Sequence, residues 1–443
     1  MKVPVIAVFD IGKTNKKLLL FDGQVQVVFE YSAQLAEITD EDGFPCEDLE
    51  KLKSFIFDAM QEIFNHPDFE IKGLNFSSYG ASFVYLDALG KPLTPLYNYL
   101  KPYPDALLEQ FYSKYGGKEE FAKQTASPVL GSLNSGMQAY RIKYEQPELF
   151  QKIASILHLP QYLSYLITGQ IYSDITSIGC HTNLWDFQKN AYHYWLEAEN
   201  IQDKLARLIP SDTLIQASFE DKHFGAGIGL HDSSSALIPY LVSFKEPFIL
   251  ISTGTWCISL NPFNLSPLSK EELQNDCLCY LQYMGKPVKA SRLFAGHEHE
   301  EELKRITKHF NQPKERYEQM PFDFSFLRFL KEEEQAFSEL DLASFSSDTE
   351  AYHRLMVHII LEQKRSSELI IKGSSVKRVF VDGGFSKNSI YMNLLCVVFP
   401  EMEISAASMA QATAMGAALA IYESFGEQKT PNDLIELKTY SAK

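Results

Sequence analysis

The sequence predicts an α/β protein of two domains with a functional cleft between them. A chain of 443 residues exceeds the size at which a single hydrophobic core usually stops growing, so two domains are expected. The pattern of apolar strand, polar turn and second apolar strand occurs twice, at 5–22 and at 248–260. Because each repeat starts one half of the chain, both domains are expected to present such a turn to a shared cleft.

The composition is that of a globular protein and argues against several classes of function. Hydrophobic residues make up 45% of the chain and charged residues 22%. A formal net charge of -16 disfavours a nucleic-acid partner, since such proteins bind phosphates through clustered Lys and Arg. Among six cysteines only Cys277 and Cys279 lie close together, which predicts reduced thiols. No signal peptide or run of ~20 apolar residues is visible, so a cytoplasmic protein without membrane contact is expected.

The first turn predicts phosphate binding. Gly12, Lys13 and Thr14 suggest a P-loop, but Ala7 stands where that motif requires glycine and a strand follows in place of a helix. A turn between two strands can hold phosphate in another way, through backbone N–H groups and a hydroxyl, while the Asp10 carboxylate reaches a magnesium ion. An ordinary hairpin with a polar tip is the alternative.

The second half of the chain repeats this chemistry. Thr253, Gly254 and Thr255 form the turn of the second repeat, and a coincidental hairpin is now the less favoured account. Further on, a buried strand ends at Gly383 and Gly384 and a helix follows. Glycines at that point let the backbone approach a flat ligand closely, and the helix N-terminus can face it.

Two polar segments of the first half are candidates for substrate contact. A glycine-rich segment delivers His231 and Asp232 to the start of a helix. Asp232 would serve as an N-cap, or as a general base that faces a substrate hydroxyl, and the residues alone leave both roles open. The turn with Tyr79, Gly80 and Ala81 offers a stacking face and nearby hydroxyls to a sugar, or is a polar loop between core strands.

Three further features favour structural roles. Asp174 is interpreted as a hydrogen-bonding structural aspartate. The segment around His297 lacks the second histidine of a zinc-binding helix, because Glu301 occupies that position, so a solvated acidic helix start is predicted. The small side chains of residues 410–420 predict a helix that packs closely against backbone between the two domains.

These motifs occur in the order found in the sugar kinase, Hsp70 and actin superfamily. The motifs that carry this resemblance are 10–15, 252–256, 382–384 and 412–416. Within the superfamily the chain resembles the FGGY carbohydrate kinases over nearly its whole length, and most of all the members that act on L-rhamnulose. Segments 79–87, 160–169 and 231–236 carry that closer resemblance. It implies two actin-like, ribonuclease H-like domains, one at 1–243 for sugar and phosphate and one at 244–443 for the nucleotide.

The resemblance also implies an activity, which is transfer of the ATP γ-phosphate to a sugar hydroxyl with Mg²⁺. Asp232 would accept the hydroxyl proton and, with Asp10, hold the metal ion. The residues implied to bind phosphate or ATP are Asp10, Gly12, Lys13, Thr14, Asn15, Thr253, Gly254, Thr255, Gly383, Gly384 and Asn388. The residues implied to contact the sugar are Tyr79, Gly80, Ala81, His231 and Asp232.

The chain departs from the family at several positions. Lys13 stands where many members have a small residue, so its contact with phosphate is open. Gly80 and Ala81 replace the Arg-Glu and Met-His pairs of the glycerol and xylulose kinases, which disfavours those two substrates. The segment around Gly296 matches the family poorly, which leaves that part of the nucleotide site open.

The expected substrate is therefore a deoxy-ketohexose such as L-rhamnulose or L-fuculose. Another ketose or polyol is an alternative, and so is a catalytically silent sugar sensor, although no DNA-binding segment is evident. The short segment after the small-residue helix disfavours an Hsp70-like peptide-binding module. A homodimer is compatible with the sequence.

Overall fold

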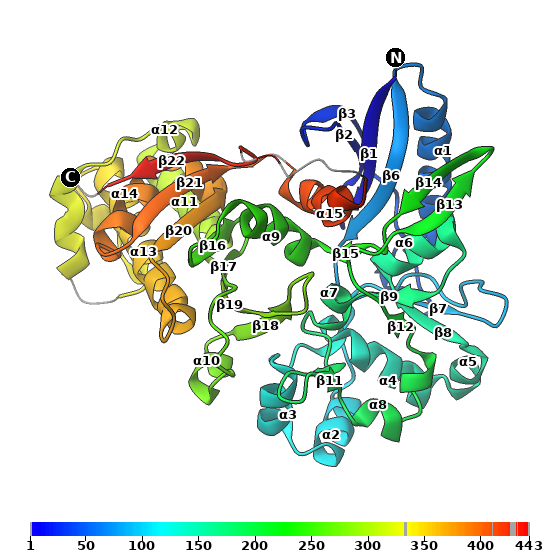
Figure 1. Cartoon of the computed structure of the whole chain (residues 1–443). Coiled ribbons are helices and arrows are strands. Elements are labelled where there is room, and N and C mark those ends of the chain that lie inside the picture. The colour runs from blue at the N-terminus through cyan, green and yellow to red at the C-terminus, as the bar shows by residue number, and fades with distance from the viewer. Residues whose placement is uncertain (1, 332–334, 410, 426–430, 432, 442–443) are drawn as a thin grey trace.

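The computed structural model describes residues 2–331, 335–409, 411–425, 431 and 433–441, arranged as two lobes (Figure 1). The sheet of the first lobe is formed by strands within residues 3–231, and the sheet of the second lobe by strands within residues 248–440. Within the described residues, none of the helices combines the length and the apolar character needed to cross a membrane.

The first lobe is built on a mixed sheet whose strands follow the order β13-β14-β6-β1-β2-β3, with β15 also paired to β6. These strands are β1 Val3–Ile11, β2 Lys16–Phe21, β3 Val27–Ala33, β6 Phe69–Ser78, β13 Ile215–Phe219, β14 Lys222–Ala226 and β15 Leu230–His231. Its helices are α1 Leu49–Asn65, α2 Asp105–Lys114, α3 Lys118–Thr125, α4 Ser135–Glu145, α5 Pro147–Lys152, α6 Leu159–Thr168, α7 Ile175–Ile178, α8 Trp195–Ala198 and α9 Asp232–Ser243. Shorter strands are β4 Ile38–Thr39, β5 Pro45–Cys46, β7 Phe83–Leu86, β8 Ser155–His158, β9 Tyr172–Ser173, β10 Trp185–Asp186, β11 Ala191–Tyr192 and β12 Arg207–Leu208.

The second lobe has a sheet of order β18-β19-β17-β16-β20-β21-β22. These strands are β16 Phe248–Thr253, β17 Cys257–Asn261, β18 Cys277–Leu281, β19 Pro287–Leu293, β20 Arg378–Gly383, β21 Glu403–Ser408 and β22 Glu436–Tyr440. The helices after residue 243 are α10 Lys270–Gln274, α11 Ala295–Phe310, α12 Glu315–Glu318, α13 Asp348–Ile371, α14 Ser389–Val398 and α15 Ala412–Tyr422. Short 3₁₀ helices, including η3 Phe324–Lys331 and η6 Gly384–Lys387, connect several of these elements.

The two sheets share one arrangement at their centres. In the first, β1 pairs antiparallel with β2 and parallel with β6. In the second, β16 pairs antiparallel with β17 and parallel with β20. The two polar turns predicted from the sequence therefore occupy equivalent places, each at the end of a central strand, which confirms the duplicated architecture.

The first sheet buries both faces, as the alternation of side chains along β1 requires. Val5, Ala7 and Phe9 point to one face, where they belong to the apolar core that includes α1. Ile6 and Val8 point to the other face, where they share a core with residues of α15. The continuous apolar run of β1 follows from this double burial.

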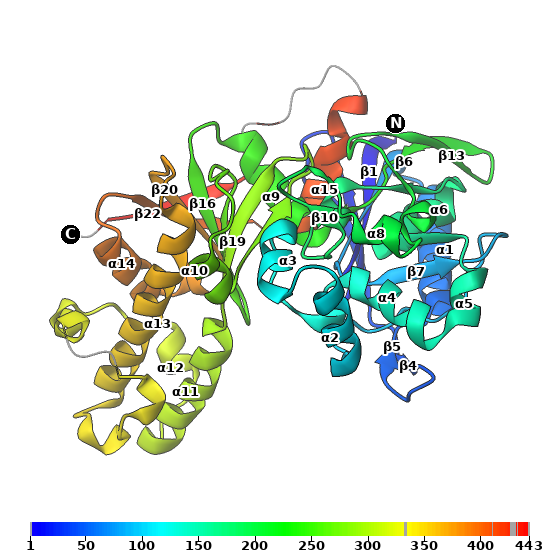
Figure 2. The ribbon, with the colours of Figure 1, turned by 90° about the horizontal axis from the view of Figure 1, so that it is seen from below.

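Helix α15 lies between the lobes, beside β1 and α9, although it comes late in the sequence (Figures 1 and 2). A Cβ atom on Gly416 would lie 1.8 Å from the carbonyl oxygen of Ser235 in α9. The Asn75 side chain donates a hydrogen bond to the carbonyl of Ala417, at 2.8 Å. The predicted close packing of this helix against backbone is confirmed for residues 412–420, whereas residue 410 lies outside the described residues. The domain boundary at 243–244 stays a prediction.

Several helix ends follow the local signals of the sequence. Asp48 caps α1 by accepting from the N–H groups of Glu50 and Lys51. Helix α6 ends at Gly169, whose φ of 65° is in the left-handed region that glycine tolerates. Asp174 accepts hydrogen bonds from Thr176 at the start of α7 and from the Ser211 hydroxyl, which confirms its structural interpretation.

Candidate active site

Asp232 occupies the first turn of α9, at the end of the first lobe that faces the second. The N-cap of this helix is His231, so the capping role considered for Asp232 is wrong: the helix begins at Asp232 itself. Its Oδ1 atom accepts from the Ser233 N–H at 2.5 Å and lies 3.2 Å from His231 Nε2. The side chain remains 37% exposed, which leaves a fixed carboxylate accessible to a ligand.

Asp10 lies at the carboxyl end of β1, opposite Lys17 of β2. Burial and the negative charge of Asp232 raise the pKa of Asp10 to about 7, although Lys17 opposes this rise. The two carboxylates are therefore close enough to repel each other. Such a pair is stabilised in its ionised form by a cation between or beside the two groups.

The residues present fit a magnesium ion. The described part of the chain holds no group of three or more His, Cys, Asp or Glu side chains suited to a metal. Mg²⁺ commonly takes only one or two carboxylates in a phosphate-binding site and completes its shell with phosphate and water oxygens. Asp10 and Asp232 supply a donor set of that kind.

The turn after β1 exposes its tip. The Gly12 N–H donates to the Asn15 carbonyl at 3.0 Å, which closes the turn, and Thr14 and Asn15 are exposed. Lys13 points elsewhere, because its ammonium lies 2.6 Å from a carboxylate oxygen of Glu37. Asn15 Oδ1 accepts a hydrogen bond from the Gln34 amide at 3.0 Å, so Thr14 is the residue of this tip whose side chain is open to a ligand, while the charge of Lys13 is already compensated.

A buried lysine that the sequence motif does not include anchors this turn. Lys16 Nζ donates to the carbonyls of Gly12 and Lys13, each at 3.0 Å. The same ammonium lies 3.0 Å from Glu47, which also accepts a hydrogen bond from the Tyr79 hydroxyl at 2.8 Å. The buried pair of Lys16 and Glu47 therefore holds the backbone of this turn in place from the interior of the lobe. Sequence reasoning missed them because neither the pairing nor the burial is visible in a local pattern.

A cavity of about 460 Å³ lies in the second lobe, within the size range of ligand sites. Five of the residues implied to bind the nucleotide line it, namely Thr253, Gly254, Thr255, Gly384 and Asn388. Its other lining residues are Gly296, His299, Glu300, Leu303, Lys314, Tyr317, Glu318, Tyr352, Phe385 and Lys387. One cavity therefore collects the strand-turn-strand motif and the Gly-Gly motif, which lie about 130 residues apart in the sequence.

The wall of this cavity depends on close backbone contacts. Thr253 Oγ1 donates to the Asp382 carbonyl at 2.6 Å and accepts from the Phe385 N–H at 2.9 Å. Gly383 has a φ of 88°, and a Cβ atom there would lie 2.0 Å from the Thr253 carbonyl oxygen. The Thr253 hydroxyl thus holds the Gly-Gly turn in place, and Gly383 shapes the wall without lining the cavity.

The start of α11 belongs to the same cavity. A solvated acidic helix start was predicted here, but Gly296 is buried and a Cβ on it would lie 1.8 Å from the Gly254 carbonyl oxygen. His299 lines the cavity, and burial lowers its pKa to about 4. The prediction is wrong for these two residues, because Gly296 packs against Gly254 and His299 against Tyr352 and Phe385, which are contacts between distant segments.

The turn after β6 meets the residues beside Asp232. A Cβ atom on Gly80 would lie 2.9 Å from His231 Cδ2 and 3.0 Å from Cys180 Sγ, so glycine lets His231 and Cys180 pack directly against this turn. The Ala81 carbonyl accepts a hydrogen bond from Gln138. The Tyr79 hydroxyl donates to Glu47 and the ring is buried in the core of the first lobe, so the sugar contact expected of Tyr79 stays a prediction.

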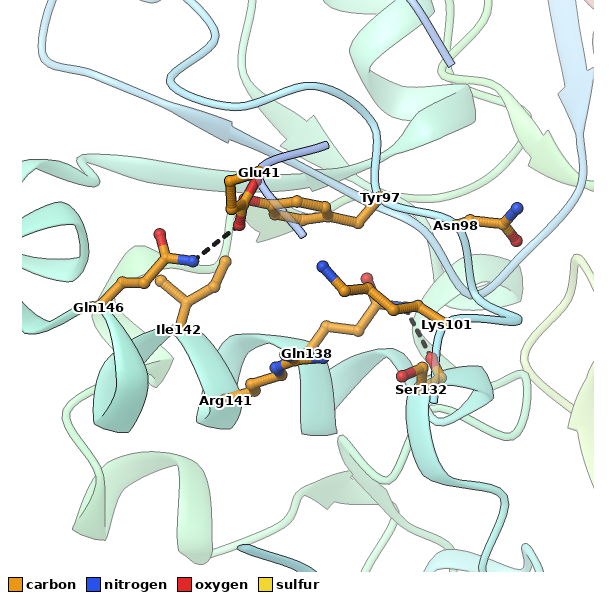
Figure 3. Close-up of a pocket in the computed structure, with 9 residues that line it drawn as sticks. All are labelled: Glu41, Tyr97, Asn98, Lys101, Ser132, Gln138, Arg141, Ile142 and Gln146. Carbon is orange, nitrogen blue, oxygen red and sulfur yellow. Dashed lines mark hydrogen bonds between the residues drawn. The ribbon is translucent and has the colours of Figure 1, made fainter. Parts of the chain in front are cut away.

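Another cavity, in the first lobe, lies between α4 and the segments that carry Glu41 and residues 97–101 (Figure 3). The two charged side chains Lys101 and Glu41 already have partners. Lys101 lies 2.6 Å from Asp40, and Glu41 accepts hydrogen bonds from the Gln146 amide and the Tyr97 hydroxyl. Its volume of about 30 Å³ is that of a water-sized space. It does not have the size of a sugar or nucleotide site.

The two-lobed architecture is shared with carbohydrate kinases of known structure. A carbohydrate kinase from Novosphingobium aromaticivorans shares the fold with a TM-score of 0.81 at 20% identity, over 100% of this chain and 95% of that one. Plasmodium falciparum glycerol kinase with ADP has a TM-score of 0.75 at 16% identity, over 95% and 89% of the two chains. These likenesses confirm the predicted fold of two actin-like domains.

The chain belongs to the FGGY family of carbohydrate kinases. The model of the family's N-terminal domain matches residues 5–236, and that of a C-terminal domain of the family matches residues 245–430.

Curated relatives match about half of the chain at low sequence identity. A rhamnulokinase of Halalkalibacterium halodurans is 25% identical over 262 residues, which are 56% of this chain and 52% of that protein. An L-fuculokinase of Salmonella typhi is 24% identical over 269 residues, or 58% and 56% of the two chains. The chain spans about half the length of the curated relatives it matches.

Proposed function

We propose that this protein transfers the γ-phosphate of ATP to a hydroxyl group of a ketose. The observation that carries the proposal is the open carboxylate of Asp232, held beside Asp10 on one lobe, with the cavity that gathers Thr253, Gly254 and Thr255 on the other. Phosphoryl transfer needs mainly positioning and charge neutralisation, which a site divided between two lobes provides. Membership of the FGGY family supports the same reaction.

Asp232 acts as the general base in this proposal. Ser233 and His231 hold Oδ1, so the carboxylate has a fixed direction, and Oδ2 has no hydrogen bond to a described residue. Oδ2 accepts the proton of the acceptor hydroxyl as its oxygen attacks phosphorus. Mg²⁺, when bound by Asp10 and Asp232 with the phosphates, neutralises charge on the transferring group. Thr14 and Asn15 face the phosphates from the first lobe.

We assign the nucleotide to the 460 Å³ cavity. In this proposal Gly254 and Thr255 hold the phosphates and Gly384 borders the adenine, while Asn388 lies at the N-terminus of α14, where a helix favours negative charge. Lys387 adds an exposed cation at the same wall. This distribution explains how a chain of strongly negative net charge can hold a triphosphate.

The substrate we propose is a deoxy-ketohexose such as L-rhamnulose or L-fuculose. Relatives named rhamnulokinase and L-fuculokinase support this class. Gly80 supports it too, since His231 and Cys180 pack directly against this glycine and leave no place there for the larger side chains of the glycerol and xylulose kinases. Another ketose or polyol is the second candidate. ADP release measured over L-rhamnulose, L-fuculose, D-xylulose and glycerol decides between them, and absence of turnover with every sugar would favour a silent sensor.

Gly80→Val is expected to block the sugar and spare the nucleotide. A Cβ there would stand 2.9 Å from His231 Cδ2 and 3.0 Å from Cys180 Sγ, so valine should displace the imidazole beside the base and the KM for the ketose should rise at least about tenfold. The KM for ATP should stay within about twofold, because the nucleotide cavity lies on the other lobe. Steady-state kinetics with each substrate varied in turn measures both.

Magnesium affinity is expected to fall as pH is lowered below about 7. The Asp10 carboxyl, with its pKa raised to about 7, must lose its proton before it can bind the ion, so protons and Mg²⁺ compete. Well below pH 7 the affinity should drop by roughly tenfold per pH unit, and above pH 8 it should be constant. Calorimetric titration of the free protein with Mg²⁺ between pH 5.5 and 8.5 tests this. Asp10→Asn should remove the pH dependence, and a flat profile in the unaltered protein would contradict it.

A further inference from the structure

His181 lies in the segment between α7 and β10 and has an unusual backbone. Its φ of 31° is positive, a region that residues with a Cβ atom rarely adopt and that favours Gly or Asn. Its carbonyl accepts a hydrogen bond from the Asn134 amide at 2.8 Å, which helps hold this conformation. Strain of this kind at a residue that is not glycine often marks a site where the side chain is needed.

The imidazole of His181 has no partner of its own. Both ring nitrogens are buried, and neither makes a hydrogen bond with any residue that the structure describes. Burial lowers the pKa of His181 to about 3, so the ring is neutral at physiological pH. A neutral imidazole carries one donor and one acceptor, the same pair of functions that a hydroxyl group has. Buried polar atoms are normally paired, so two unpaired ones require an explanation.

His181 lies one side chain away from the proposed base. Its ring centroid is 6.2 Å from that of His231, whose Nε2 atom is 3.2 Å from Asp232. Tyr280 covers both imidazoles, at 6.0 Å from His181 and 5.6 Å from His231. Tyr280 belongs to β18 and hence to the other lobe, so this cluster of rings spans the cleft.

Strand β18 is fitted closely against the first lobe on both sides of Tyr280. The Cys279 N–H donates to the Ala126 carbonyl at 2.9 Å, and the Ser234 hydroxyl donates to the Leu281 carbonyl at 3.2 Å. The Leu281 side chain fills the place where a Cβ on Gly179 would stand, at 2.5 Å. Ser234 comes two residues after Asp232, so the position of Tyr280 is tied to the helix that carries the base.

We propose that His181 binds a hydroxyl of the acceptor sugar other than the one that is phosphorylated, and that Tyr280 closes over the same part of the sugar from the second lobe. In this proposal the sugar enters when β18 separates from the first lobe, which breaks the Cys279–Ala126 and Ser234–Leu281 hydrogen bonds, moves the Tyr280 ring away and exposes the two nitrogens of His181. When the lobes close, the sugar hydroxyl pairs with the imidazole and the apolar ring excludes water. His181 then selects the sugar by the position of this hydroxyl. The inference rests on the proposed function and names a specificity residue of that site.

His181→Gly is the sharpest test, because it separates the two roles of this residue. Glycine accepts the positive φ without strain, which offsets part of the cost of the cavity left by the buried imidazole, so the variant is expected to stay folded in a urea titration. The KM for the best ketose among L-rhamnulose, L-fuculose and D-xylulose should nevertheless rise at least about tenfold, with the KM for ATP unchanged. Equilibrium binding of the same sugar without nucleotide, measured by calorimetry, should weaken by a similar factor.

Control variants complete the design. Asn190→Gly relieves a positive φ of 52° at an exposed position of the same lobe and should leave the sugar KM unchanged. Tyr280→Phe keeps the covering ring and should stay within about threefold of the unaltered protein, whereas Tyr280→Ala should raise the sugar KM at least about tenfold. The ratio of kcat/KM values between the best and second-best ketose should shrink in His181→Gly.

The outcomes separate the inference from the proposed function. If the unaltered protein phosphorylates a ketose and His181→Gly keeps its sugar KM and its binding constant, His181 is structural and the inference is overturned. If the unaltered protein neither binds nor phosphorylates any of these sugars, the proposed function is rejected, and the inference with it. A stable variant with weakened sugar binding and intact ATP kinetics supports both.

Discussion

Replacement of Asp232 by Asn is expected to lower kcat by at least about 100-fold, within the range of 10² to 10⁴ that a general base contributes. The amide keeps the shape of the side chain and can still accept from the Ser233 N–H, so α9 should start at the same residue. It cannot accept the proton of the sugar hydroxyl, and it weakens the charge that Asp10 and Asp232 present to Mg²⁺. Coupled measurement of ADP formation gives kcat, and fluorescence titration gives ATP affinity.

Two results make this experiment decisive. ATP binding should survive in Asp232→Asn, because the nucleotide cavity is lined by residues of the second lobe. Asp105→Asn, which alters an exposed aspartate in the first turn of α2, should leave kcat unchanged. Turnover of Asp232→Asn within a few fold of normal would reject Asp232 as the base and would return its carboxylate to a structural role.

The second large effect is expected from Lys16→Met. The Lys16 ammonium and the Glu47 carboxylate are both almost fully buried and lie 3.0 Å apart. Removal of one member of such a pair leaves an uncompensated buried charge and typically costs about 3–5 kcal/mol. Lys13, whose ammonium lies 3.9 Å from Glu47, offsets part of this loss, so about 3 kcal/mol is expected. The midpoint of the first transition in urea unfolding measures it.

The same variant should also weaken nucleotide use, because the carbonyls of Gly12 and Lys13 lose the ammonium that fixes the phosphate turn. A rise of at least about fivefold in the KM for ATP is expected, roughly 1 kcal/mol of binding. The double variant Lys16→Met with Glu47→Gln removes the uncompensated charge and should regain stability without regaining ATP affinity. Equal stability of the single and double variants would contradict the buried-pair explanation.

Features set by neighbouring residues were predictable from the sequence. The cap at Asp48, the end of α6 at Gly169 and the span of α13 from Asp348 to Ile371 follow from local backbone chemistry and apolar spacing. The two strand-turn-strand motifs were visible for the same reason, and their repetition predicted the two related sheets.

Features that join distant segments were not predictable from one sequence. The contact of Gly296 with the Gly254 carbonyl, the pairing of Lys16 with Glu47 and the approach of Tyr280 to His181 each depend on the assembled fold. The local sequence around each of these residues carries no signal of its role, because each residue becomes buried only in the tertiary structure. The positive φ of His181 marks it as unusual in the structure. This backbone angle cannot be inferred from the sequence around His181.

The place of α15 has a consequence for how the protein is made. One face of the first sheet, with Ile6, Val8 and Leu19, is covered by apolar residues of 414–422. A ribosome synthesises this sheet early and its cover late, at about 5–20 residues per second, so the nascent first lobe exposes an apolar surface for tens of seconds. Final assembly of the base-bearing helix α9 against α15 therefore waits for nearly the whole chain. Newly made protein should become active only after this last helix has docked.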